Sequence, residues 1–140
     1  MKTLFPAFRV SELDRSLAFY AAVGYRELSR VEVEGGCLVL LLFPEEDAVS
    51  LELVHRPADG PVSVEGFDHL GVQVENLDLI REQLTRRGLQ LGPTETPGGP
   101  DGPRTAWLVD PDGYRLELVQ WPPGHADGIT AVDVAAAPEQ

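Results

Sequence analysis

The two halves of this chain carry similar residues in the same order, at a nearly constant distance along the sequence. The word LELV occurs around Glu52 and again around Glu117, 65 residues later. Four further pairs of identical residues lie 64 positions apart, and these are Val10 and Val74, Leu13 and Leu77, Asp14 and Asp78, and Gly24 and Gly88. A single residue of loop length accounts for the difference. The chain is therefore predicted to fold as two similar modules.

The first half reads as a strand, a helix and three further strands. Ser11 is expected to cap the N-terminus of the helix, because Asp14 follows three residues later, and Gly24 falls where a left-handed C-terminal cap belongs. The pair Gly35 and Gly36 is typical of a tight turn between two strands. The four expected strands cover residues 4–10, 25–34, 37–43 and 49–55. This order is βαβββ.

The second half has the same order. Asn76 is expected to cap a helix that ends at Gly88. The four expected strands cover residues 67–75, 89–94, 105–109 and 114–121. We therefore predict an α+β fold in which two paired βαβββ modules form a curved mixed sheet with a concave cleft. Within a single domain of residues 1–140, the expected parts are module one (3–55), a linker (56–66), module two (67–121) and a tail (122–140).

Each LELV word places a carboxylate in an otherwise apolar strand. Alternate residues of a strand face opposite sides, so Glu52 and Glu117 point away from the leucines that flank them. Solvation alone explains one such glutamate, and a lone histidine is more often structural. However, two modules related by a pseudo-twofold axis would bring equivalent positions to one cleft. The positions that would converge are Phe5, Glu52, His69 and Glu117. Two carboxylates and an imidazole suit a divalent zinc, nickel, cobalt, manganese or iron ion.

Two arginines are predicted to face the same cleft. Arg9 shares the strand face of Phe5, and Arg56 shares that of Glu52. A guanidinium is the usual donor to a substrate carboxylate, and the alternative is an ion pair with one of the 23 acidic residues. His55 should face away from the cleft, so we exclude it as a ligand.

Composition excludes several classes of function. The formal net charge is −12, so the field of the protein repels nucleic acid and anionic lipid. The longest apolar run, residues 37–43, is far shorter than the roughly 20 residues of a membrane span. The N-terminal segment lacks the apolar stretch of a secretory signal. Cys37 is the single cysteine, so no internal disulfide is expected. We expect a cytoplasmic protein that acts on a small molecule.

The repeat and its motifs resemble the vicinal oxygen chelate superfamily, which includes glyoxalase I, bleomycin-resistance proteins and extradiol dioxygenases. The segments that carry the resemblance extend over nearly all of residues 4–121, and they are RVSELDRSLAFYAAVGY, LELV, FDHLGVQVENLD and WLVDPDGYRLELV. The pattern is most similar to glyoxalase I, which converts the hemithioacetal of methylglyoxal and a thiol into a hydroxyacyl thioester.

The resemblance implies a divalent metal at four positions, one at the start and one at the end of each module. These positions hold Phe5, Glu52, His69 and Glu117 here. Phe5 cannot bind a metal, so three protein ligands are implied, with water or substrate in the remaining position. The resemblance also implies that Glu52 or Glu117 moves a proton between adjacent carbons and that Arg9 contacts a substrate carboxylate. Arg56 departs from the family, which has an asparagine there.

Two other functions fit the same resemblance. One is a metal-free protein that sequesters a small molecule, as bleomycin-resistance members do, with Phe5 stacked against the ligand. An extradiol dioxygenase is disfavoured, because its iron site needs two histidines and one carboxylate. We also expect a homodimer, since half-open sheets leave strand edges that a second chain can cover.

Overall fold

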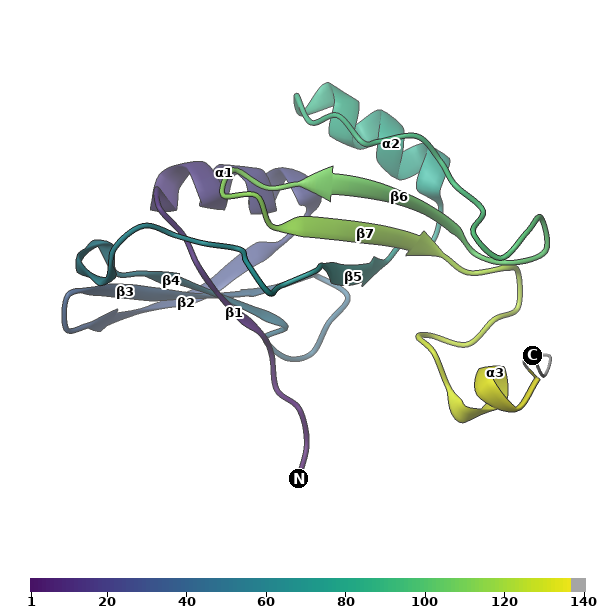
Figure 1. The fold of residues 1–140 in the computed structure, drawn as a ribbon, viewed down its shortest axis with the longest axis horizontal. Helices are drawn as coiled ribbons and strands as arrows, with labels where there is room; N and C mark the ends of the chain where they lie inside the picture. The colour runs from purple at the N-terminus through teal and green to yellow at the C-terminus, as the bar shows by residue number, and fades with distance from the viewer. Residues whose placement is uncertain (137–140) are drawn as a thin grey trace.

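The computed structural model describes residues 1–136 and confirms the predicted α+β class. Within one chain the strands form two separate sheets rather than one continuous sheet. The first has the order β1-β4-β3-β2, with β1 parallel to β4 and the other neighbours antiparallel. Its strands are β1 (Ala7–Arg9), β2 (Arg26–Val33), β3 (Gly36–Leu42) and β4 (Leu51–His55). Figure 1 shows this sheet below the second one.

The second sheet has three strands in the order β5-β7-β6. The expected strand at 89–94 is not formed. The chain meets β6 there through a bridge between Glu95 and Thr105 and a hydrogen bond from the Gly92 amide to the Trp107 carbonyl. Pro93 lacks the amide hydrogen that a continuous ladder requires. The strands are β5 (Leu70–Gln73), β6 (Arg104–Val109) and β7 (Arg115–Gln120).

The two longer helices are α1 (Leu13–Val23) and α2 (Leu77–Arg86). Asn76 caps α2 as predicted, because its Oδ1 accepts a hydrogen bond from the Leu79 amide at 3.0 Å. The predicted cap on α1 is wrong. Ser11 directs its hydroxyl and its amide to the carboxylate of Asp112 instead, in the turn between β6 and β7. A residue expected to act within its own module therefore connects the two modules.

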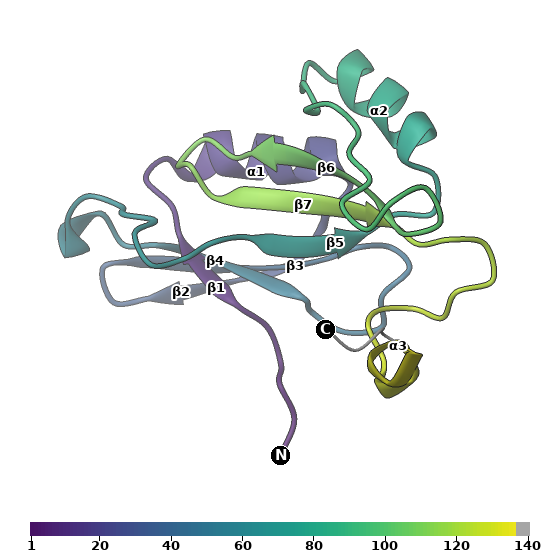
Figure 2. The same ribbon diagram turned by 45° about the vertical axis from the view of Figure 1, so that its right-hand side comes forward.

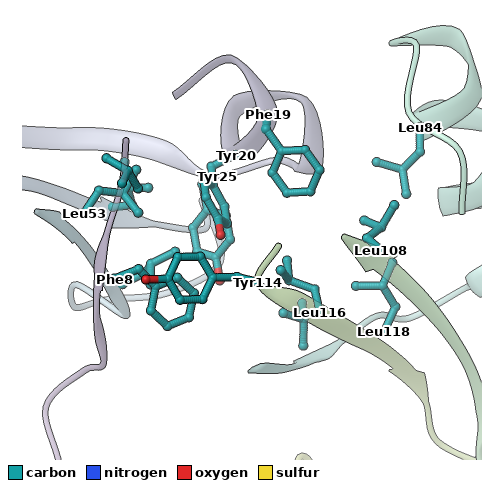
Figure 3. Close-up of a cluster of buried hydrophobic side chains, with 14 of the residues drawn as sticks. Phe8, Phe19, Tyr20, Tyr25, Leu53, Leu84, Leu108, Tyr114, Leu116 and Leu118 are labelled. Atoms are coloured by element: carbon teal, nitrogen blue, oxygen red, sulfur yellow. The ribbon is translucent and has the colours of Figure 1, made fainter. Parts of the chain in front are cut away.

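One hydrophobic core is shared by both modules. Figure 3 shows Phe19 and Tyr20 of α1 beside side chains from both sheets. Phe8 on β1 stacks on Tyr114, just before β7, with the ring centroids 4.4 Å apart. The LELV leucines are almost completely buried in this core, and they are Leu51, Leu53, Leu116 and Leu118. The predicted alternation is therefore confirmed, because the leucines fill the core face of each sheet.

A buried hydrogen-bond cluster around Asp110 joins α1 to the turn between β6 and β7. The Tyr20 hydroxyl donates to Asp110 Oδ2 at 2.7 Å, and the amides of Asp112 and Tyr114 donate to Oδ1 at 2.8 Å each. Burial raises the pKa of the Asp110 carboxyl. Burial, together with the neighbouring Asp110 carboxylate, also raises the pKa of Tyr20 far above its usual value. The turn of module two is thereby fastened to the helix of module one.

The tail contains a short helix, α3 (Ala131–Ala136), which the sequence pattern did not indicate. In both ribbon views, α3 lies below the strands of the second sheet, whereas α2 lies above them (Figures 1 and 2). The Gln73 side chain holds the tail in place. It accepts hydrogen bonds from Trp121 Nε1 at 2.7 Å and the Gly128 amide at 2.8 Å, and it donates to Asp127 at 2.7 Å. Among residues 1–136, no helix has the length and apolar character to cross a membrane.

Candidate functional site

The first sheet has an open face opposite the core, and Glu52 lies at its centre. Leu53 beside it is completely buried, whereas Glu52 is half-buried and faces the other way. The neighbours of Glu52 in register are Ala7 on β1 and Leu40 on β3. The carboxylate therefore stands between small and apolar side chains.

Glu117 has the same position in the second sheet. It lies on β7, between Gly71 on the parallel strand β5 and Trp107 on the antiparallel strand β6. A Cβ added to Gly71 would meet no atom within 4 Å, so there is free space on that side of the carboxylate. The two glutamates therefore occupy equivalent positions in the two sheets, as the repeat predicted.

His69 lies beside Glu117 and is held by its neighbour in the sequence. Its Nε2 is 3.9 Å from Glu117 Oε1, and its Nδ1 is 2.5 Å from Asp68 Oδ2. The hydrogen bond from His69 holds the pKa of the Asp68 carboxyl below its usual value. A carboxylate on one ring nitrogen fixes the tautomer and leaves the other nitrogen free to act as a ligand or acceptor. In His69 this free nitrogen is the one next to Glu117.

The spacing of these two donors is close to that of ligands on one metal. Two ligands that each lie about 2.1 Å from a zinc-like ion are roughly 3.0–3.4 Å apart. A small side-chain movement would close the 3.9 Å between His69 Nε2 and Glu117 Oε1. Glu52 does not complete the site within one chain, because it lies on the other sheet. The described residues contain no group of three His, Cys, Asp or Glu side chains placed to bind a metal.

Of the three predicted substrate-binding residues, Phe5 and Arg9 belong to the first module, and Arg56 is the first residue of the linker. By alternation, Arg9 shares the open face of Glu52, since Ala7 and Arg9 pair with Glu52 and Val54. Phe5 is half-buried and precedes β1, two residues before Ala7. Arg9 donates from Nη2 to the Gly60 carbonyl at 2.8 Å, and its Nε is buried without a partner among the described residues. Arg56 is exposed, and its Nη1 lies 3.7 Å from Asp59.

Three residues near Glu117 and His69, in the second module, were missed by the sequence analysis. Trp107 meets His69 edge-on with ring centroids 5.0 Å apart, and the guanidinium carbon of Arg115 lies 4.1 Å from the centroid of the Trp107 ring. Asp68 is the third. The signal for the first two was present, because counting outward from the DPDG turn pairs Trp107 with Glu117. No sequence pattern indicated the role of Asp68.

His125 fastens the tail in a way that should depend on pH. Its Nδ1 is 2.6 Å from the Ala126 carbonyl and its Nε2 is 2.6 Å from Asp133 Oδ1, so the doubly protonated ring satisfies both acceptors. The Ala126 carbonyl and the Asp133 carboxylate raise the pKa of His125. Thr130 and His125 lower the pKa of Asp133. The imidazolium form is therefore favoured in the folded tail.

We predict that the tail is held most firmly between these two pKa values. The contribution of His125 is fully present below its unfolded pKa of about 6.5 and is lost as pH rises through the higher folded value. The contribution of Asp133 is lost as pH falls through its lowered value. NMR titration of His125, which stacks on Trp121, should give a midpoint above about 6.5. A midpoint at or below the free-histidine value would contradict the prediction, and Asp133→Asn should lower the midpoint.

A family model described as the Glyoxalase/Bleomycin resistance protein/Dioxygenase superfamily matches residues 4–118. The lactoylglutathione lyase of Salmonella typhimurium is 30% identical over 132 residues, which cover 86% of this chain and 93% of that protein. A probable chloroplastic lactoylglutathione lyase of Arabidopsis thaliana is 26% identical over 136 residues, and this chain spans 35% of its length.

Two solved structures are also similar to this chain. The trypanothione-dependent glyoxalase I of Leishmania major is 28% identical, with a TM-score of 0.65 and a match that covers 86% of each chain. A bleomycin resistance determinant encoded on the transposon Tn5 is 23% identical, with a TM-score of 0.64, covering 86% of this chain and 98% of that one. The second likeness concerns the fold alone. By its family match, its curated relatives and its repeated βαβ architecture, the chain belongs to the Glyoxalase/Bleomycin resistance protein/Dioxygenase superfamily.

Proposed function

We propose that this protein is a cytoplasmic glyoxalase I-like lyase that isomerises a thiol hemithioacetal or a related small carbonyl compound. The relatives named lactoylglutathione lyase support this activity. The observation that carries the proposal is the pair of His69 and Glu117 on an open sheet face, with the free ring nitrogen of His69 toward the carboxylate. Glu52 holds the equivalent position on the other sheet.

The complete site in this proposal forms between two copies of the chain. One copy contributes His69 and Glu117, and a second copy contributes Glu52. Two features support this arrangement. Within one chain the glutamates lie on separate sheets, and the outer strands β1 and β5 each leave one edge without a strand partner among the described residues. A twofold dimer would pair these edges and create two identical sites.

The reaction moves one proton between adjacent carbons and a second proton between the oxygens that these carbons carry. The C–H bond on the carbon that carries sulfur breaks, and a proton is added to the neighbouring carbonyl carbon. The hydroxyl oxygen of the first carbon becomes the thioester carbonyl, and the carbonyl oxygen of the second becomes a hydroxyl. Atoms and electrons balance without an external reductant. Glu52 or Glu117 accepts the proton and returns it, a role that typically contributes about 10²–10⁴-fold to the rate.

His69, Glu117 and the Glu52 of a second copy would hold the divalent ion, with no protein donor at Phe5. Such an ion, when bound, polarises the substrate oxygens as a Lewis acid. Asp68 keeps the His69 ring oriented for this role. In this proposal Arg9, on the face of the first sheet that carries Glu52, would bind a carboxylate of the thiol.

The proposal predicts that protein purified without chelator forms a thioester from methylglyoxal and at least one thiol of a panel, in a metal-dependent way. His69→Ala should lower kcat/KM by about 100-fold or more, because it removes a metal ligand. His55→Ala is the matched control, since His55 pairs with the buried Cys37 on the other face of β4 and should leave the rate unchanged. Thioester absorbance and isothermal calorimetry with nickel, cobalt, zinc, manganese and iron(II) are the measurements. No thioester and no metal binding under any condition would overturn the proposal.

Phe5 favours a second candidate, a metal-free protein that sequesters a small molecule. Phe5 is half-buried and lies two residues before Ala7, the neighbour of Glu52 in register, and an aromatic side chain at such a position can stack on a ligand beside Glu52. Thermal shift against a small-molecule panel, with and without metal, separates the two candidates. Stabilisation by compounds but never by metal would favour sequestration, and stabilisation by metal would favour the lyase.

A further inference from the structure

The Arg115 side chain stacks on an aromatic ring beside the candidate site. Its guanidinium carbon lies 4.1 Å from the centroid of the Trp107 ring. Arg115 is two residues before Glu117 on β7, and Trp107 is the cross-strand neighbour of Glu117. Reaching Trp107 therefore turns the Arg115 side chain along the open face toward Glu117. Arg115 is exposed, and the aromatic face favours this position of its guanidinium group.

The edge of this guanidinium is available to a ligand. Stacking uses the flat face of the group and leaves its N–H donors, which lie in the plane, free to bind. The backbone of Arg115 pairs with Val109, but among residues 1–136 its guanidinium group makes no hydrogen bond and no ion pair within 4.0 Å, only the stacking on Trp107. The pKa of the Asp68 carboxyl is lowered first by the hydrogen bond from His69, with a smaller contribution from the charge of Arg115. A purely structural cation–π pair would explain the stacking, but it would not require a free donor edge beside His69 and Glu117.

The surroundings leave room for a small molecule next to this donor edge. Gly71 lies on the far side of Glu117 and has no atom within 4 Å of the position where a Cβ would be. His69 lies edge-on to the same Trp107 ring, with the ring centroids 5.0 Å apart. A ligand over Gly71 and Glu117 would thus have His69 close to it and Arg115 at one end.

The charge of the protein makes this cation significant for anionic ligands. The chain has 23 acidic residues against 11 basic ones, so anions are repelled from most of its surface. A planar carboxylate matches the two parallel N–H donors of a guanidinium edge. We propose that Arg115, positioned by Trp107, binds a carboxylate of the ligand that lies over His69 and Glu117, so that the protein prefers carbonyl compounds bearing a carboxylate. This inference rests on the proposed function and specifies its substrate class.

Trp107 provides the measurement. The chain has two tryptophans, so Trp121→Phe leaves Trp107 as the only one. In this background, titration with glyoxylate should change the Trp107 fluorescence. Arg115→Met keeps the aliphatic stem but removes the charge, and it should raise the Kd for glyoxylate about tenfold or more. Arg115→Lys should give an intermediate value, because it keeps the charge without the planar fork. Arg86→Met, at an exposed position at the end of α2, is the matched control and should bind glyoxylate as the parent does.

The outcomes separate the proposed carboxylate subsite from the proposed lyase activity. Equal glyoxylate affinity of the parent and Arg115→Met, or no glyoxylate binding by the parent, overturns the inference. Competition by inorganic phosphate as strong as that by glyoxylate overturns the assignment to a carboxylate. Binding that depends on Arg115 without any thioester formation overturns the proposed lyase activity but supports the subsite. Thioester formation by a protein whose glyoxylate affinity does not depend on Arg115 supports the lyase activity and overturns the carboxylate subsite.

Discussion

A dimer that combines a Glu52→Gln chain with a Glu117→Gln chain should regain about half of the wild-type activity, although each variant alone is inactive. In a twofold dimer with shared sites, one of the two sites of this heterodimer contains both mutations and the other contains neither. Each single variant should lose roughly 10²–10⁴-fold in kcat/KM, because a charged ligand or base has been replaced by a neutral amide. Two different affinity tags allow the heterodimer to be purified and its thioester formation measured.

A matched control heterodimer exchanges the activities expected for shared sites and for sites within one chain. A Glu52→Gln/Glu117→Gln chain is paired with a wild-type chain, so the number of mutations in the dimer is unchanged. Shared sites predict almost no activity, since each site then contains one mutated glutamate. Sites formed within one chain predict about half activity for this pair and none for the first heterodimer. Half activity in the control pair would therefore reject the site between two copies.

Asp110→Ala should destabilise the protein by about 3–5 kcal/mol, which is a large part of the roughly 5–15 kcal/mol by which domains are stable. The Asp110 carboxylate is 4% exposed and accepts hydrogen bonds from Tyr20 and from two backbone amides. Alanine leaves all three donors buried without a partner, and each such donor costs about 1–3 kcal/mol, partly recovered by relaxation. The free energy of unfolding in urea is the measurement.

Two smaller changes separate hydrogen bonding from charge. Asp110→Asn keeps one acceptor oxygen for the two amides, and its NH₂ can donate to the Tyr20 hydroxyl, so the loss should be about 1–2 kcal/mol. Tyr20→Phe removes one donor and should cost a similar amount. Combined with Asp110→Ala, Tyr20→Phe should add less than it does alone, because the partner is already missing. A loss below about 0.5 kcal/mol for Asp110→Ala would contradict the assigned role.

The repeat was a reliable guide to the elements because each depends mainly on local pattern. The alternation of Leu51, Glu52 and Leu53 places the carboxylate opposite the core whatever the rest of the chain does. Asn76 capped its helix as expected, since the bond to Leu79 closes within one turn. The strand predicted from the repeat at 89–94 is wrong, because Pro93 has no amide hydrogen to donate to a strand ladder.

Ser11 and Trp107 make contacts that the local sequence pattern did not predict. Ser11 has the form of a helix cap, but a stronger acceptor, Asp112, lies next to it only after the chain has folded. The pairing of Trp107 with Glu117 follows from the register of β6 and β7. The contact between Trp107 and His69 requires β5 to lie beside β7, and these strands are not consecutive. Contacts between residues this far apart in the sequence cannot be read from a local pattern.

From the sequence alone, one can establish which side chains share an open sheet face, since backbone alternation imposes that choice residue by residue. Glu52 and Glu117 are equivalent for this reason. The tertiary structure decided which faces meet. His69 and Glu117 come together because β5 and β7 pair, whereas Glu52 lies on a separate sheet whose position depends on the shared core and the Asp110 cluster. Those long-range contacts arise from packing, which no local pattern of residues specifies.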